Sequence, residues 1–341
     1  MILEVLFTPA NTGSILTHIQ FASMEVGIII QQIFVLFILA LIGLIATKLN
    51  VIQRDIKTGI TKIIFNITLP FLIITQISSL EIDQQILISW GMIILFSFLS
   101  IIMFLQIGRL THRLLKLPHS KAPIHVLHTA FGNAVFLGFP ILDAIFPNGD
   151  GLLYGIIYFL TQNTMMWTLG IFVFTREEHQ KKVDSLKNLI NPNTISFLIG
   201  LTMLLTGIQI PGFMFETLHG LGQTTLYLAM LYIGAILADV NFKAIVKNKS
   251  TFILSLNKLI IGPVILMVLL NLVLTHTPLG LNMTAQTVII LESAMPCMTL
   301  LVILARKYGK DDFYATQNLS ISTLLSIITL PLIFYLSQII L

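Results

Sequence analysis

The chain has 341 residues, of which 56% are hydrophobic and 10% are charged, whereas soluble domains carry about 25% charged residues. With a mean hydropathy of +0.93, the composition excludes a soluble protein and predicts an all-α protein that crosses a membrane several times. The single cysteine, Cys297, excludes an intramolecular disulfide framework and a cysteine-based metal cluster.

The apolar segments follow a stretch that does not resemble a signal peptide. Residues 1–24 contain no Lys or Arg and so lack the charged start of a secretory signal; we expect an extracytoplasmic leader there.

A helix that crosses about 30 Å of hydrocarbon needs roughly 20 apolar residues. Ten stretches satisfy this length and predict ten transmembrane helices, at about 26–47, 59–79, 86–108, 125–146, 152–174, 194–210, 217–238, 251–275, 285–305 and 314–340.

The predicted helices divide into two halves of nearly equal length, residues 25–174 and 193–341, joined by a linker at 175–192. Each half contains an odd number of helices, so the two halves must face opposite ways in the membrane. Inverted repeats are typical of secondary transporters, which bind their substrate near the middle of the membrane. The expected fold is therefore a polytopic membrane protein of two inverted five-helix repeats.

The 19 Lys and Arg residues gather in alternate loops, except for Lys258, which lies inside an apolar run. Positive residues stay on the cytoplasmic side, so we expect a protein of the cytoplasmic membrane with both termini outside. This topology also accounts for the net charge of +4, which therefore indicates no nucleic-acid partner. The clusters are Lys48, Arg54, Lys57 and Lys62; Arg109, Arg113, Lys116 and Lys121; Arg176, Lys181, Lys182 and Lys187; Lys243, Lys247 and Lys249; and Arg306, Lys307 and Lys310.

The fourth predicted helix of each half contains a proline in mid-span, Pro140 in the first half and Pro296 in the second. Proline lacks an N–H and clashes with the carbonyl four residues earlier, so we expect both helices to be broken. Interrupted helices at matching positions of two repeats indicate a transporter's binding site. The expected site is the opened backbone of Phe136–Pro140 and of Glu292–Thr299.

Asn133 lies two turns before Pro140, beside glycines that let another backbone approach closely. Its amide can donate a hydrogen bond to a carboxylate, although an interhelical hydrogen bond also explains an asparagine there. We expect Gln162 and Asn163 either to line the cavity or to join two helices by hydrogen bonds, and Cys297 is most simply a small apolar side chain. The candidate substrate-binding residues are Gly132, Asn133, Phe136, Gly138, Pro140, Asn163, Pro296, Cys297 and Thr299.

Glu292 is an acid within a predicted helix, where a carboxylate is costly and usually functional. It precedes Pro296 by four residues, so its carboxylate and a freed carbonyl would share one level, and hard cations prefer oxygen ligands. We expect Glu292 to bind a coupling H⁺ or Na⁺, with Asn66, four residues before Pro70, as a second candidate ligand. The alternatives are a protonated Glu292 bonded to a neighbouring helix and a structural kink at Asn66.

Two histidines and one lysine inside predicted helices are candidates for chemistry. His125 and His128 have the spacing of a proton relay or a metal pair, but the local sequence supplies no third ligand, so we expect no metal. Lys258 is expected to snorkel to the membrane surface or to pair with an acid.

The sequence lacks a P-loop, an H-E-x-x-H motif and a potassium-filter sequence. We therefore expect a secondary carrier for a small carboxylate, with no cofactor apart from a coupling H⁺ or Na⁺. Its expected partners are the carboxylate, the lipid bilayer and a second copy in a homodimer. The alternative is a channel-like or facilitative permease for a small polar solute. An enzyme is disfavoured because no catalytic dyad is evident.

Several motifs together resemble the auxin efflux carrier family in its short-loop bacterial form, over residues 25–341. Glu292, just before the second break, also resembles a glutamate of the bile-acid sodium symporters. The motifs are Asn66–Pro70, Gly132–Pro140 (GNAVFLGFP), Trp167–Gly170, Leu189–Pro192, Ala294–Cys297 (AMPC) and Leu304–Gly309 (LARKYG).

The resemblance implies ten helices in two inverted repeats, with the fourth and ninth helices crossing. It implies transport of small organic anions, such as malonate or malate in bacteria, with Asn133 and the two prolines Pro140 and Pro296 at the substrate site. Unlike plant members, this chain has Leu301 in place of a second proline and no acid in residues 86–108, which disfavours auxin as the substrate.

Overall fold

The computed structural model describes residues 34–80, 84–147, 149–175, 190–238, 248–276 and 281–341. The predicted leader at 1–24 and most of the predicted linker at 175–192 lie outside these residues. Within them the regular structure is helical, apart from one isolated β-bridge, which confirms the all-α prediction.

The helices run close to the predicted stretches, and the first described helix is Phe34–Lys48. The others are α2 (Arg54–Ile63), η2 (Ile64–Thr68), α3 (Leu69–Ser78), α4 (Gln84–Leu114), α5 (Ala122–Ala130), η3 (Ala134–Gly138), α6 (Phe139–Ile145), α7 (Asp150–Met165), η4 (Met166–Gly170), α8 (Ile171–Thr175), α10 (Pro192–Thr206), α11 (Gly212–Leu237), α13 (Lys249–Leu256), η5 (Asn257–Ile261), α14 (Gly262–His276), α15 (Met283–Ser293), α16 (Leu300–Lys307) and α17 (Asp312–Ile340).

Helix length and composition indicate a multi-pass membrane protein. In the described part of the chain, six continuous helices are long and apolar enough to cross a membrane. They are Arg54–Ser78, Ile88–Leu114, Asp150–Phe174, Gly212–Leu237, Lys249–His276 and Asp312–Ile340.

Short π-helical segments let several helices continue through a proline. The segments η2, η3 and η5 are followed, at the second residue of the next helix, by Pro70, Pro140 and Pro263. A π turn widens the helix locally and so accommodates a residue that cannot make the usual backbone bond. The predicted opening at Phe136–Pro140 is therefore wrong, because these residues are helical.

The first break lies earlier in the chain, at Phe131–Asn133, between α5 and η3. The backbone is extended at Phe131 (φ −101°, ψ 123°) and non-helical at Asn133 (φ −86°, ψ 64°). The second break occupies Ala294–Thr299, between α15 and α16, within the predicted range. Both predicted interruptions are therefore present.

Helix α7 lies in the centre of the molecule and packs against α4, α6 and α15. Elsewhere, glycines permit close helix contact. A side chain on Gly43 would overlap the backbone of Leu231, and one on Gly234 would overlap the backbone of Ala40. The first described helix and α11 therefore meet at small residues, as is common in membrane bundles.

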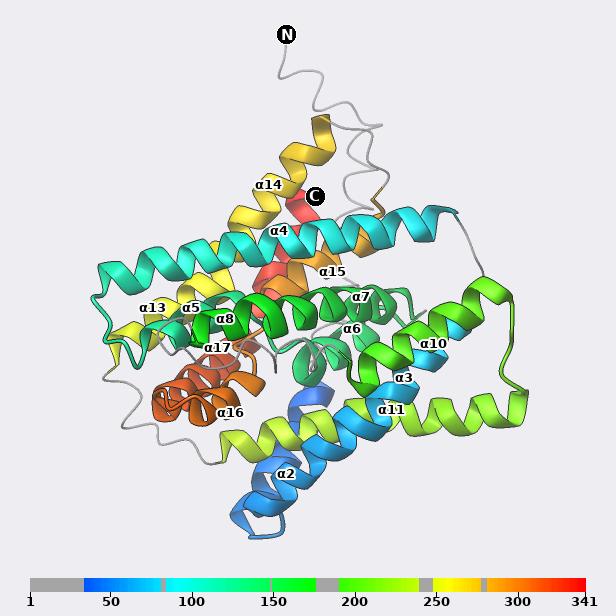
Figure 1. The fold of residues 1–341 in the computed structure, drawn as a ribbon, viewed down its shortest axis with the longest axis horizontal. Coiled ribbons are helices and arrows are strands. Elements are labelled where there is room, and N and C mark those ends of the chain that lie inside the picture. The colour runs from blue at the N-terminus through cyan, green and yellow to red at the C-terminus, as the bar shows by residue number, and fades with distance from the viewer. Residues whose placement is uncertain (1–33, 81–83, 148, 176–189, 239–247, 277–280) are drawn as a thin grey trace, which may run out of the picture.

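The basic loops gather at one end of the bundle. The start of α2 and the ends of α4 and α16 lie at the left and lower left of Figure 1, whereas α3 ends and α11 begins at the right. Two contacts support this grouping: Lys57 Nζ donates to the carbonyl of Ala235 at 2.8 Å, and Lys121 pairs with Asp311 at 3.7 Å.

Candidate functional site

The two broken segments lie against each other and share backbone hydrogen bonds. The N–H of Asn133 donates to the carbonyl of Pro296 at 2.8 Å, and the N–H of Met298 donates to the carbonyl of Phe131 at 3.1 Å. Between them, Gly132 and Cys297 form an isolated antiparallel bridge. The unwound backbone is thus buried and paired, as backbone polar groups require at membrane depth.

Gln162, on α7, holds the first break with both ends of its amide. Its Oε1 accepts from the N–H of Gly132 at 2.9 Å, and its Nε2 donates to the carbonyl of Gly132 at 3.0 Å. Gln162 is buried, so these bonds satisfy two backbone groups that water cannot reach.

Two helices begin directly after the breaks and face a common pocket. Ala134–Ile145 starts at one side and α16 at the other. The pocket has about 260 Å³ of empty space, including its opening. Its lining residues are Phe65, Gly132, Asn133, Ala134, Val135, Phe136, Phe159, Gln162, Met298, Thr299 and Leu300. We call it the junction pocket.

The junction pocket suits an anion. The first N–H groups of a helix lack partners within the helix, and a helix N-terminus carries a partial positive charge. Asn133 and Thr299 add polar side chains, and Asn133 Nδ2 donates to Thr299 Oγ1 at 3.3 Å. This bond is long, so the amide can be redirected to a ligand at modest cost.

A second cavity adjoins the junction pocket and shares Phe65 and Leu300 with it. It has about 700 Å³ of empty space, including open solvent, and we call it the vestibule. Four of the residues that line the vestibule are asparagines, although its exposed lining is mainly apolar. Its other lining residues are Asn66, Asn163, Trp167, Ile190, Asn191, Pro192 and Asn193.

Glu292 is fully buried near the end of α15, outside both cavities. Its carboxylate lies against two glycines: a Cβ on Gly138 would be 2.6 Å from Oε1, and one on Gly155 would be 3.4 Å away. Among the described residues neither carboxylate oxygen has a hydrogen-bond partner. The prediction that Pro296 frees the carbonyl of Glu292 is wrong, because the N–H of Met295 donates to this carbonyl at 3.3 Å.

Lys258 does not snorkel, since its side chain is 1% exposed. Its ammonium donates to the carbonyl of Ser293 at 3.0 Å, so it binds the end of α15. The two histidines also differ from a metal pair. His125 bonds Thr111 and Tyr314, each at 2.9 Å, whereas the ring nitrogens of His128 have no partner in the described part of the chain.

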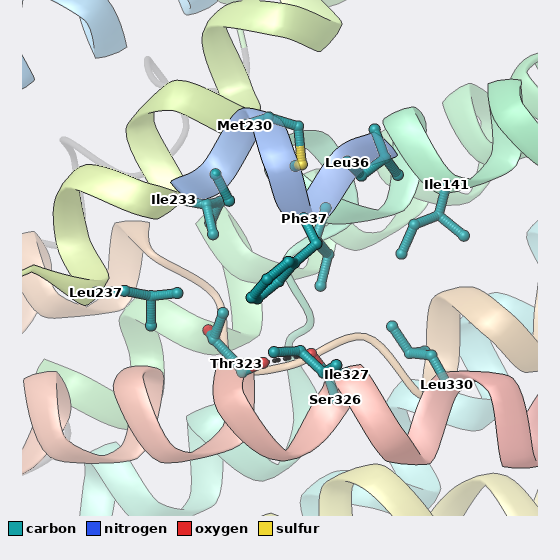
Figure 2. Close-up of a pocket in the computed structure, with 12 residues that line it drawn as sticks. Leu36, Phe37, Ile141, Met230, Ile233, Leu237, Thr323, Ser326, Ile327 and Leu330 are labelled. Atoms are coloured by element: carbon teal, nitrogen blue, oxygen red, sulfur yellow. Dashed lines mark hydrogen bonds between the residues drawn. The ribbon is translucent and has the colours of Figure 1, made fainter. Parts of the chain in front are cut away.

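A third, largely apolar pocket of about 540 Å³ lies between Phe34–Lys48, α11 and α17 (Figure 2). Its two hydroxyl groups are already used, because Ser326 donates to Thr323 and Thr323 donates to Leu319 within α17. It offers no positive group to a carboxylate, so we do not assign substrate binding to it.

Two broken segments that pair inside a helix bundle are typical of a carrier, and sequence comparison agrees. A family model described as a membrane transport protein matches residues 28–334. The chain belongs to the auxin efflux carrier family.

The relatives of this transporter include an uncharacterized transporter of Methanocaldococcus jannaschii, 22% identical over 304 residues, or 88% of this chain and 96% of that protein. The uncharacterized transporter YfdV of Escherichia coli is 22% identical over 323 residues, 91% of this chain and 98% of its own. An uncharacterized transporter of Methanothermobacter thermautotrophicus is 24% identical over 307 residues, 89% and 96% respectively. The family and these relatives are transporters, not enzymes.

In this transporter, the predicted substrate residues fall into three groups. Gly132, Asn133, Phe136 and Thr299 line the junction pocket, and Asn163 lines the vestibule. Pro140, Pro296 and Cys297 line neither cavity. The carbonyl of Pro296 accepts the N–H of Asn133, and the N–H of Cys297 donates to Ser322 at 3.0 Å.

The two predicted coupling residues lie in different places. Asn66 is exposed in the vestibule and donates to the carbonyl of Lys62 at 2.8 Å, which fits a kink. Glu292 lies outside both cavities and beside Gly138, the remaining predicted substrate residue.

Lys258 was expected to snorkel or to pair with an acid, and neither expectation named its bond to the carbonyl of Ser293. Gln162 was expected to line the cavity or to join two helices, and the sequence did not name Gly132 as its partner.

Proposed function

We propose that this protein is a secondary transporter that moves a small carboxylate across the cytoplasmic membrane by alternating access. The observation that carries this proposal is the junction pocket, where two helix N-termini, the Asn133 amide and the Thr299 hydroxyl converge at the paired breaks. A carboxylate there would receive N–H groups and positive dipole ends.

The junction pocket is nearly closed in this conformation. Its cavity volume of about 20 Å³ has room for roughly one water molecule, whereas small-molecule sites span roughly 300–1,000 Å³. A carboxylate would therefore bind only after the pocket widens, as alternating access requires. Phe65, Phe136 and Phe159 supply the apolar wall that would pack on a short carbon chain.

The proposed topology is ten helices in two inverted repeats, with the basic loops in the cytoplasm and both termini outside. It is supported by the two breaks at corresponding positions of the halves and by the positive-inside rule. In this orientation the vestibule leads from the junction pocket toward Asn191 and Pro192, which begin the second repeat on the cytoplasmic side.

Transport would be coupled to H⁺ or Na⁺ through Glu292. Its buried carboxylate has no hydrogen-bond partner among the described residues. Such a group is too costly to remain bare, so it would hold a cation or a proton for part of the cycle. Its neighbour Gly138 belongs to the helix that begins at the junction pocket, which would link ion binding to the substrate site.

The experiment that tests this function is a thermal-shift screen of the purified protein against small organic acids. A ligand that binds the folded state raises its stability by mass action. The acid that stabilises the wild type should bind Asn133→Ala more weakly by about 1–3 kcal/mol, because a charge-assisted hydrogen bond is lost. Asn163→Ala, in the vestibule, should lose less. Equal affinity of folded Asn133→Ala and wild type would contradict the assigned site.

A further inference from the structure

Lys258 lies at the paired breaks, yet neither cavity includes it. It stands in the π segment η5, between α13 and α14, and its side chain is 1% exposed. A fully buried ammonium is expensive unless other groups replace its water. Its surroundings therefore indicate what it does.

The ammonium occupies the negative end of a helix. Nζ donates to the carbonyl of Ser293 at 3.0 Å, and Ser293 is the last residue of α15. The final carbonyls of a helix lack partners within the helix and carry a partial negative charge. A cation is thus favoured at this point of the fold.

The same ammonium also touches the other break. A Cβ on Gly132 would lie 3.3 Å from Nζ and 3.2 Å from the carbonyl oxygen of Glu292. Gly132 therefore leaves the space in which Lys258 reaches between the two interrupted helices. The ammonium sits where both broken segments meet.

An aromatic ring completes the enclosure. Nζ lies 4.8 Å from the ring centroid of Phe104, a distance at which the ring face attracts a cation. A side chain on Gly262 would overlap the Phe104 ring. Gly262, one turn after Lys258, thus lets this ring pack close to η5.

The titratable groups that face Lys258 are Glu292, Cys297 and His128. Neither carboxylate oxygen of Glu292 is hydrogen-bonded in the described residues, so the carboxyl group and the Lys258 ammonium interact only through their charges. A positive charge on Lys258 would thus be held at this junction by its covalent attachment to the chain.

We propose that Lys258 is the resident cation of this transporter: its ammonium takes the place at the helix junction that a coupling sodium ion would otherwise fill, so carboxylate transport does not depend on Na⁺. The statement that transport does not depend on Na⁺ rests on the proposed function, whereas the position of the Lys258 ammonium does not. Of the two coupling ions considered, it selects against Na⁺.

The first test compares wild-type protein in matched NaCl, KCl and choline chloride. We expect the same midpoint of thermal unfolding in all three salts, and the same initial rate of carboxylate uptake into proteoliposomes. A higher midpoint or a faster rate in NaCl would overturn the proposal, because a sodium ion would then have a site of its own. The stability measurement involves no substrate, so it stands even if the carboxylate proposal fails.

The second test removes the tethered charge. Lys258→Ala should unfold several degrees lower, and Na⁺ or methylammonium, but not choline, should restore part of the loss by entering the vacated space. Lys249→Ala, an exposed lysine on the preceding helix, should match the wild type in every salt. A Lys258→Ala protein that is indifferent to the cation would overturn the proposal.

The variant Lys258→Met covers the case in which Lys258→Ala does not fold. Methionine fills a similar volume without charge, so transport should fall several-fold while the midpoint changes little. Full transport by Lys258→Met would show that the ammonium is dispensable and would overturn the proposal. If the wild type binds no carboxylate but the salt results hold, the proposed function fails and the resident cation remains.

Discussion

Gly138 and Glu292 meet so closely that the glycine has no room for a side chain: a Cβ there would lie 2.6 Å from Oε1 of the carboxylate. Glu292 lies one residue before the end of α15, the helix before one break, and Gly138 belongs to the helix after the other. The contact between Gly138 and Glu292 therefore depends on how the two broken helices pack against each other.

Gly138→Ala should destabilise the protein by about 1–3 kcal/mol, because overpacking a buried contact forces neighbouring groups apart. Thermal unfolding in detergent measures this loss. Gly91→Ala is the matched control, since nothing lies within 4 Å of a Cβ at Gly91. In Gly138→Ala/Glu292→Ala the two effects should not add, because the clash is removed. If the losses of stability in the two single variants add up in the double variant, the strain in Gly138→Ala does not come from Glu292.

Gln162→Ala should weaken the first break, since the N–H and carbonyl of Gly132 would be left buried without partners. Each unpaired group costs about 1–3 kcal/mol, and unfolding midpoints measure the sum. Thr164→Ala serves as the control because this exposed hydroxyl donates to Leu160 of its own helix. A Gln162→Ala protein as stable as Thr164→Ala would show that the junction does not need the amide.

Glu292→Gln should abolish accumulation against a gradient more severely than substrate binding. The amide keeps the shape of the side chain but cannot titrate. Uptake into proteoliposomes with imposed pH and Na⁺ gradients separates the two ions. If Lys258 is the resident cation, Na⁺ drives no transport, and Glu292→Gln should lose the response of uptake to the pH gradient. If the mutant concentrates substrate with unchanged responses to both gradients, Glu292 has no part in coupling.

The proposed topology predicts which loops an impermeant thiol reagent reaches in intact cells. After Cys297→Ala removes the native thiol, Ser79→Cys, at the end of α3, should be labelled. Ser120→Cys, between α4 and α5, should be labelled only after permeabilisation. Both side chains are exposed, so access depends on the membrane side. The reverse pattern would invert the orientation.

The sequence predicted the helical class, the apolar segments and the presence of two breaks, because hydropathy and mid-span prolines are local signals. It misplaced the first break. Pro140 is accommodated by a π turn, whereas the chain opens at Phe131–Asn133, where backbone hydrogen bonds to the other half hold it. Such pairing joins residues more than 160 positions apart, and no local pattern shows it.

The same limit applies to the side chains around the breaks. Asn133 and Thr299 were predicted as site residues from their neighbours in sequence, and both line the junction pocket. For Gln162 and Lys258, the sequence indicated a buried polar group in need of a partner. The partners, Gly132 and the carbonyl of Ser293, depend on how α7, α15 and η5 pack.

Counterflow of a labelled carboxylate into proteoliposomes tests the central claim most directly. Vesicles preloaded with the unlabelled acid identified by thermal shift should take up the labelled acid transiently and saturably, because an alternating-access carrier exchanges one substrate for another. Asn133→Ala should require more substrate for half-maximal exchange, and Asn163→Ala should stay closer to the wild type. Uptake that neither saturates nor responds to preloading would contradict the account and indicate a channel.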